Sequence, residues 1–83
     1  MGPDTRPWVR RNWWYAANYL TTHPCVDCGE TNGMVLEFDH IRGEKRMNIK
    51  EAIWKLQFED LKTEIAKCDI RCANDHRRRH FND

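Results

Sequence analysis

The sequence predicts a small α+β domain stapled by a bound metal ion, and three features carry this prediction. The stretch MVLEFDHI at residues 34–41 is short, rich in apolar residues and roughly alternating, which is typical of a strand. Segments on both sides of it repeat apolar residues every three or four positions, as helices do. Four cysteines fall in two pairs in a chain of 83 residues. A chain this short buries only about 60% of its unfolded surface and often needs such a staple.

The charges indicate one basic face rather than a basic protein. The formal net charge is only +1, so the overall balance does not mark a nucleic-acid binder. Acidic residues concentrate in the middle of the chain, between positions 30 and 69. A chain that is neutral overall can still present one basic surface to a polyanion. The arginines that would form that surface gather toward the two ends of the chain: Arg6, Arg10, Arg11, Arg71, Arg77, Arg78 and Arg79.

The absence of membrane and export signals predicts a cytoplasmic protein. No apolar run approaches the roughly 20 residues that span a bilayer, and the first residues lack the apolar core of a signal peptide. In a reducing compartment, four cysteines indicate metal ligands rather than two disulfides. We therefore expect structural zinc.

An N-terminal helix is predicted from Pro7 to about Thr21, within an aromatic and basic segment that covers residues 1–23. Residues 1–6 are expected to be irregular, and Pro7 suits a first helical turn. One apolar face follows from the spacing of Val9, Trp13, Ala16 or Ala17, and Leu20. The segment holds four more aromatic residues: Trp8, Trp14, Tyr15 and Tyr19. We expect most of these rings to lie in the core and the remainder to face DNA or a partner.

The rest of the chain, residues 24–83, divides into short elements. A knuckle-like turn rich in Pro and Gly precedes the strand, and RGEKR forms a loop after it. A helical pattern begins at Ile49, with a break expected near Gln57. CDIRC, residues 68–72, is expected to be extended, and a last helix starts at about Asn74. The apolar face of the middle helical segment is expected to hold Trp54, Phe58, Leu61 and Ile65.

Cys25 and Cys28 form a CxxC followed directly by Gly29. Two intervening residues let both sulfurs reach one tetrahedral ion, and a glycine permits the tight backbone beyond. A redox pair is the less favoured interpretation, because no strand leads into this motif as in a βαβ unit.

The second half of the metal site is less regular, and two ligand sets are open. Cys68 and Cys72 are separated by three residues, and a second CxxC would end at Asp75. The preference of zinc for soft thiolates favours the four-cysteine set over a set in which Asp75 replaces Cys68. Cys68 could instead be a small buried apolar residue. The favoured set is Cys25, Cys28, Cys68 and Cys72.

Two further groups could carry chemistry. Asp39 and His40 stand side by side, and neighbouring strand residues point to opposite faces, so both serve one site only where the strand ends or twists. His76 stands near the start of the last helix, where the helix dipole suits phosphate. Arg77, Arg78 and Arg79 follow, and these three cannot share one helix face.

Taken together, four motifs resemble the HNH endonuclease family, in particular the small stand-alone HNH proteins of bacteriophages and bacteria. They are CVDCG, LEFDHI, MNI and EIAKCDIRCANDHRRRH, in this order, between Pro24 and His80. The resemblance implies a ββα-metal core on a zinc-stapled treble-clef scaffold over residues 24–83, with the N-terminal helix added to it.

The resemblance also implies roles for individual residues. His40 corresponds to the general base, and Asn48 to the asparagine that orients it. Asp39 and His76 correspond to the two ligands of the catalytic cation, which is Mg²⁺ or Mn²⁺, with Ni²⁺ or Zn²⁺ as alternatives. Asp75 departs from the pattern, because many family members carry their last zinc-binding cysteine there; Cys68 is the expected substitute.

The implied function is metal-dependent hydrolysis of DNA phosphodiester bonds, as a nick or a double-strand break. The DNA is expected to be double-stranded and read with weak sequence specificity, with Arg77, Arg78 and Arg79 on its phosphates. A homodimer or a phage packaging protein is a further expected partner. The alternative is a zinc-stapled module that binds nucleic acid or assists packaging without catalysis.

Overall fold

The computed structural model describes residues 6–82, and for residues 80–82 the backbone alone. Within this range the predicted α+β class is confirmed. The elements follow one another as α1 (Pro7–Thr22), the 3-10 turn η1 (Gly33–Val35), β1 (Leu36–His40), α2 (Ile49–Lys55), α3 (Phe58–Ala66), β2 (Cys68–Cys72) and α4 (Ala73–Asn82). Most of the predicted irregular start lies outside the described residues.

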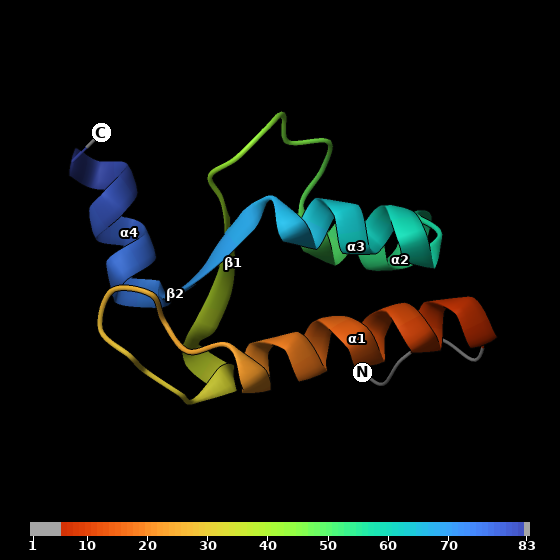
Figure 1. The fold of residues 1–83 in the computed structure, drawn as a ribbon, viewed down its shortest axis with the longest axis horizontal. Helices are drawn as coiled ribbons and strands as arrows, with labels where there is room; N and C mark the ends of the chain where they lie inside the picture. The colour runs from red at the N-terminus through yellow and green to blue at the C-terminus, as the bar shows by residue number, and fades with distance from the viewer. Residues whose placement is uncertain (1–5, 83) are drawn as a thin grey trace.

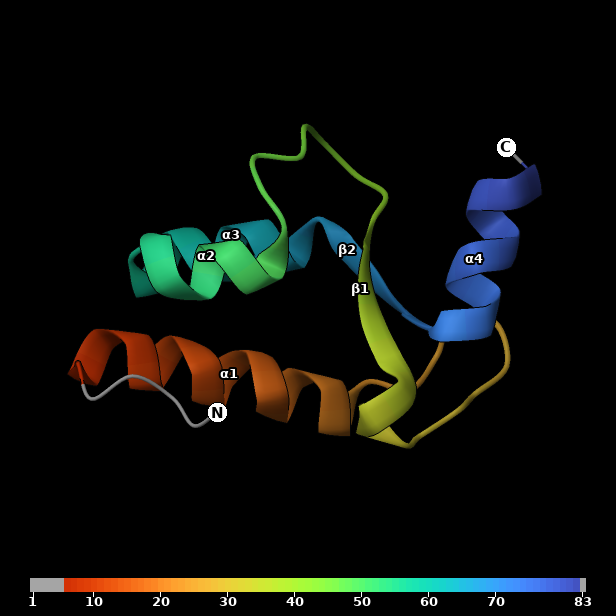
Figure 2. The same cartoon turned by 180° about the vertical axis from the view of Figure 1, so that it is seen from behind.

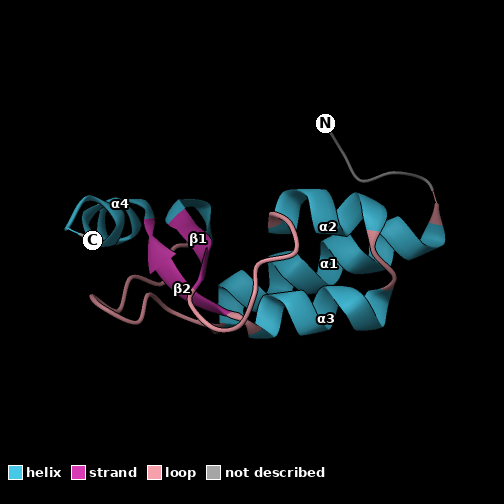
Figure 3. Ribbon diagram, turned by 90° about the horizontal axis from the view of Figure 1, so that it is seen from above, coloured by secondary structure: helices cyan, strands magenta, loops and turns pink. Residues whose placement is uncertain are grey.

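The two strands pair antiparallel, with Leu36 opposite Cys72 and His40 opposite Cys68. The helices α1, α2 and α3 pack together on one side of this sheet, and α4 lies on the other side (Figure 3). Figures 1 and 2 show α4 standing apart from the three packed helices, in contact with the strands. The sheet therefore separates an apolar half of the molecule from a polar one.

Two buried clusters form the core. The larger joins the three helices and one end of β2: Ala16, Ile49, Ala52, Leu56, Leu61, Ile65 and Cys68. The smaller lies at the other end of the sheet: Cys25, Leu36, Ile70 and Cys72. Tyr19 and Phe38 pack against both clusters, and their ring centroids lie 6.0 Å apart. These two rings therefore connect the helical half of the core to the sheet.

The buried face of α1 differs from the predicted one. Val9, Asn12 and Ala16 are buried, whereas Trp13 is 43% exposed. Trp8 and Trp14 are exposed as well, so the expectation of a core role is wrong for these tryptophans, although Tyr15 and Tyr19 do pack against the core. The small side chains of Ala16 and Ala52 are buried where α1 packs against α2 and α3, and the tryptophans of α1 lie outside this contact.

The predicted break near Gln57 is confirmed. Leu56 and Gln57 are both extended, and α2 ends at Lys55 before α3 begins at Phe58. Because of this break, the buried face of α2 does not continue in register into α3. Leu61 and Ile65 on α3 are fully buried as expected, whereas Trp54 on α2 is exposed. No helix within residues 6–82 is long and apolar enough to cross a membrane.

A buried amide ties α1 to this break. Asn12 Nδ2 donates to the carbonyl oxygens of Ile53, at 3.1 Å, and Leu56, at 2.7 Å. Carbonyls at the end of a helix lack an intrahelical donor, and burial keeps water from serving them. Asn12 therefore acts as a side-chain cap from a distant helix.

We expect Asn12→Ala to lower the free energy of unfolding by about 1–3 kcal/mol, because two buried carbonyls lose their donor. Asn18→Ala is the matched control, since Asn18 lies on the exposed side of the same helix. Urea denaturation followed by circular dichroism measures both. Equal stability of the two variants would contradict this role of Asn12.

Candidate metal cluster and catalytic site

The predicted knuckle is present and presents two cysteines to one point. The Gly29 N–H donates to the Cys25 carbonyl at 2.9 Å, and Gly29 has a φ of +79°, a conformation that favours glycine. The Val26 N–H donates to the Ile70 carbonyl, also at 2.9 Å. The knuckle is thereby closed on itself and fixed to β2.

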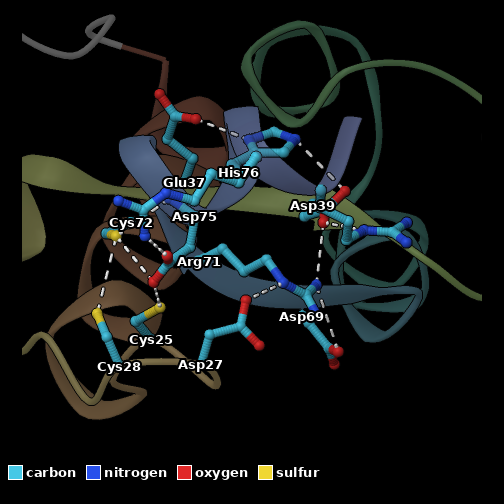
Figure 4. Close-up of polar contacts among 12 residues, drawn as sticks. Cys25, Asp27, Cys28, Glu37, Asp39, Asp69, Arg71, Cys72, Asp75 and His76 are labelled. Atoms are coloured by element: carbon cyan, nitrogen blue, oxygen red, sulfur yellow. Dashed lines mark hydrogen bonds and ion pairs between the residues drawn. The ribbon is translucent and has the colours of Figure 1, made fainter. Parts of the chain in front are cut away.

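The second half of the cluster comes from the junction of β2 and α4. Because α4 starts directly after Cys72, Asp75 lies one turn on, and its N–H donates to Cys72 Sγ at 3.5 Å. Figure 4 shows three sulfurs and the Asp75 carboxylate turned toward one another. One ligand atom from each of four residues lies within 4.8 Å of all the others: Cys25, Cys28, Cys72 and Asp75.

The spacing fits a tetrahedral ion. Two sulfurs bound to one zinc at about 2.3 Å lie roughly 3.8 Å apart, and Cys28 Sγ lies 3.8 Å from Cys72 Sγ. Asp75 Oδ2 lies 3.4 Å from Cys25 Sγ and 3.3 Å from Cys72 Sγ. Three thiols and one carboxylate form a donor set that zinc accepts.

Cys68 does not belong to this cluster, which contradicts the favoured four-cysteine set; the residues that gather are those of the alternative set with Asp75. Cys68 begins β2 and Cys72 ends it; four strand residues span about 13 Å, too far for two ligands of one ion. The Cys68 thiol is 3% exposed and donates to the Glu64 carbonyl at 3.7 Å. Burial and the nearby Glu64 raise its pKa to about 12, which keeps it a neutral core residue.

The groups of the cluster shift one another's pKa values in opposite directions. The Glu30 N–H lowers the pKa of the Cys28 thiol, but Asp75 and Cys25 outweigh this effect and raise it to about 12. Thiols of the three cysteines, with Cys28 the largest contributor, hold the pKa of Asp75 below its usual value. Three thiols that lose protons to bind a metal are thus crowded around an ionised carboxylate, which favours a bound cation.

A second polar site lies on the α4 side of the sheet. Asp39 on β1 is 1% exposed, and its Oδ1 lies 3.4 Å from His76 Nε2 on α4 (Figure 4). His76 Nδ1 lies 2.7 Å from Glu37 Oε1. Glu37 and Asp39 share one face of β1 because they are two residues apart. The structure thus brings Asp39 and His76 together, as predicted, and adds Glu37.

Two arginines neutralise Asp39. Arg71 Nη1 and Arg79 Nε donate to Asp39 Oδ2 at 2.9 Å and 2.7 Å. Burial alone would raise the pKa of Asp39, but Arg79, His76 and Arg71 outweigh it and hold the pKa below its ordinary value. Asp39 is therefore an ionised carboxylate held in a fixed orientation.

The arginines of α4 lie in different surroundings. Arg79 is bound to Asp39, Arg78 is exposed and donates to Asp75 Oδ1 at 3.1 Å, and Arg77 is exposed beside Glu37 and His76. Arg77 and Arg78 have guanidinium groups at the surface, whereas Arg79 has an internal partner.

His40 is held from the opposite face of the sheet. Its Nε2 lies 3.0 Å from Glu64 Oε2, and Glu64 is 1% exposed. Burial would raise the pKa of Glu64, but Lys67 at 2.9 Å, the Arg46 N–H at 2.9 Å and His40 lower it below its ordinary value. Glu64 is thus a buried carboxylate that fixes the imidazole and ties down the loop before α2.

Asn48, expected to orient His40, stands at the start of α2 and is exposed. Among the described residues, no hydrogen bond joins its side chain to His40; Glu64 makes that contact instead. The sequence offered no local signal for Glu64, which lies 24 positions from His40.

One groove connects these residues. It has a volume of about 540 Å³ and is lined by every residue of β1 together with Asn48 and His76. Asp39 and His40 point to opposite faces, but β1 has one unpaired edge in this two-stranded sheet, and a groove along that edge reaches both. Four positions predicted from three separate motifs therefore line one groove: Asp39, His40, Asn48 and His76.

Comparison of the chain with protein-family models, with curated proteins and with solved structures finds no match.

We expect the purified protein to carry about one zinc ion per chain, because the cluster offers four ligands. Asp75→Ala should lower the zinc content and the melting temperature, and Asp75→Cys should restore both. Plasma emission spectrometry and thermal denaturation measure them.

Cys68→Ala is the control for this experiment. It should keep the zinc content and lower the melting temperature alone, because a buried thiol is lost from the core. Loss of zinc in Cys68→Ala together with retention in Asp75→Ala would contradict the observed ligand set.

Proposed function

We propose that the protein is a metal-dependent endonuclease of the HNH type, which hydrolyses phosphodiester bonds in DNA. The observation that carries the proposal is the meeting of Asp39, His40 and His76 at one groove, although they come from a strand and a helix far apart in the chain. The order β1, β2, α4 agrees with a ββα-metal core, and the knuckle with the cluster at Asp75 agrees with a treble-clef scaffold.

Asp39 and His76 fit a cation site. A carboxylate oxygen and an imidazole nitrogen 3.4 Å apart can be ligands of the same ion, and this pair suits Mn²⁺, with Mg²⁺, Ni²⁺ or Zn²⁺ as alternatives. Glu37 holds His76 by the other ring nitrogen, as carboxylates commonly do behind a metal-binding histidine. A divalent cation supplies charge neutralisation at the phosphate and at the departing oxygen.

His40 is the proposed general base. The ionised Glu64 accepts the proton of Nε2, which leaves Nδ1 as the ring atom that can take a proton from water. In its neutral form this ring can act as a general base toward water. Glu64 is a positioning residue in this scheme, because it acts through His40.

Arg77 and Arg78 are the proposed phosphate contacts on α4, because both are exposed. Such contacts bind the DNA backbone without reading bases, which agrees with weakly sequence-specific binding to DNA.

A second candidate is a zinc-stapled nucleic-acid-binding module without catalysis. The observation that favours it is the pair of arginines on Asp39, which balance its charge without any cation. In that case Asp39 would be a structural ion-pair residue.

The test of the nuclease is conversion of supercoiled plasmid with Mg²⁺ or Mn²⁺. We expect His40→Ala and His76→Ala to lower the cleavage rate by about 10²-fold or more, since each removes a group that takes part in the reaction. His23→Ala is the matched control: His23 is exposed, stacks on Tyr19 at a ring distance of 3.7 Å, and does not line the groove. Metal-independent cleavage, or full activity of His40→Ala, would contradict the proposal.

Replacing Arg77 and Arg78 together by alanine should weaken plasmid binding. It should also reduce the slope of log K against log salt by about 1.8, because each phosphate contact contributes about 0.9. Lys62→Ala on α3 is the control, since Lys62 does not line the groove and contacts the Phe58 ring. Electrophoretic shift titrations at several salt concentrations measure the slope. An unchanged salt slope in the double variant would show that Arg77 and Arg78 do not contact the DNA phosphates.

A further inference from the structure

The groove extends well beyond the proposed catalytic residues. From the edge of β1 it continues between α1 and α2, where its wall is apolar: Trp13, Ala16, Ala17, Leu20, Ile49 and Ile53. Lys45 and Lys50 are exposed at this part of the groove, and its two acidic lining residues, Glu37 and Asp39, lie at the catalytic end. A volume of about 540 Å³ is in the range of sites that hold small organic groups.

Base-paired DNA has no exposed group that would occupy this apolar part of the groove. A duplex presents phosphates and sugars to a binding surface, and its bases are stacked out of reach of an apolar pocket. An unpaired base next to the bound phosphate would be able to enter, since every base has a face that stacks on an aromatic ring. Trp13, 43% exposed on the groove side of α1, offers such a ring.

The same surface continues along α1. Trp13 lines a second hollow of about 430 Å³ together with Arg10, Arg11 and Trp14. No acidic residue occurs between Pro7 and Thr22. Alternating cations and indoles next to a groove are the combination by which proteins bind single strands, with cations on the backbone and rings on the bases.

We propose that the groove between α1 and α2 holds an unpaired nucleobase adjacent to the phosphate at Asp39, His40 and His76. The substrate is then DNA that is single-stranded at the cleavage point. This inference rests on the proposed function for the identity of the ligand, and it narrows that function to a substrate class.

The test compares two tryptophans of the same helix. Trp13 lines the groove, whereas Trp8, 41% exposed, lines a separate hollow with Phe58 and Lys55. Binding of a fluorescein-labelled single-stranded 12-mer and of its duplex is measured by anisotropy, without added Mg²⁺ or Mn²⁺, so that no strand is cut. We expect Trp13→Ala to weaken single-strand binding by about 5- to 100-fold and to leave duplex binding unchanged. Trp8→Ala should change neither.

Several outcomes would overturn the inference. They are equal losses in Trp13→Ala and Trp8→Ala, equal losses for single strand and duplex, or duplex binding tighter than single-strand binding. Dimerisation of the protein that Trp13→Ala abolishes would assign the groove to a second copy and also overturn it. Thermal melts of both variants establish that they are folded.

The two proposals fail in different ways. If the protein cleaves plasmid but Trp13→Ala keeps its affinity for single strands, the nuclease proposal is supported and the base site is contradicted. If Trp13→Ala loses single-strand binding but the protein cleaves no plasmid with any metal, the base site is supported and the nuclease proposal is contradicted.

Discussion

The attachment of α4 is the constraint on which the rest of the site depends. From Ala73 to Arg79 this helix buries no side chain, so apolar packing does not hold it to the sheet. Its described anchors are polar: Asp75 among the cysteines, and His76 and Arg79 at β1. A metal bound at the cluster would fix the first turn of α4, and His76 is the next residue after the ligand. A metal at the cluster would therefore act on the position of His76 through a single peptide unit, and so on the proposed catalytic site.

The two faces of the sheet carry different kinds of contact. Phe38 and Ile70 pack in the buried clusters. On the other face Glu37 and Asp39 contact α4, and Arg71 donates to Asp39. His40, at the end of β1, reaches Glu64 on the core side. A wider sheet would separate these two sets of side chains, but the unpaired edge of β1 lets one groove reach both. The small size of the sheet is thus what allows His40, Asp39 and His76 to line one groove.

Local patterns predicted most of the fold, because helices, strand and knuckle each follow from nearby residues. The cysteine cluster shows where such reasoning fails: the preference of zinc for thiolates favoured Cys68, yet the length of β2 decides which side chains can meet. The bonds of Asn12 and Glu64 were not predictable either, since they join positions 41 and 24 residues apart. The exposed tryptophans of α1 depend on how closely the helices approach, which composition does not reveal.

The most direct test of the account is anomalous diffraction from crystals of the protein grown with zinc and soaked in Mn²⁺. The account predicts a zinc peak among Cys25, Cys28, Cys72 and Asp75, and a separate manganese peak between Asp39 and His76. A zinc peak at Cys68 would contradict the ligand set. The absence of manganese at Asp39, with Arg71 and Arg79 still bound to it, would contradict the catalytic site and favour the binding module.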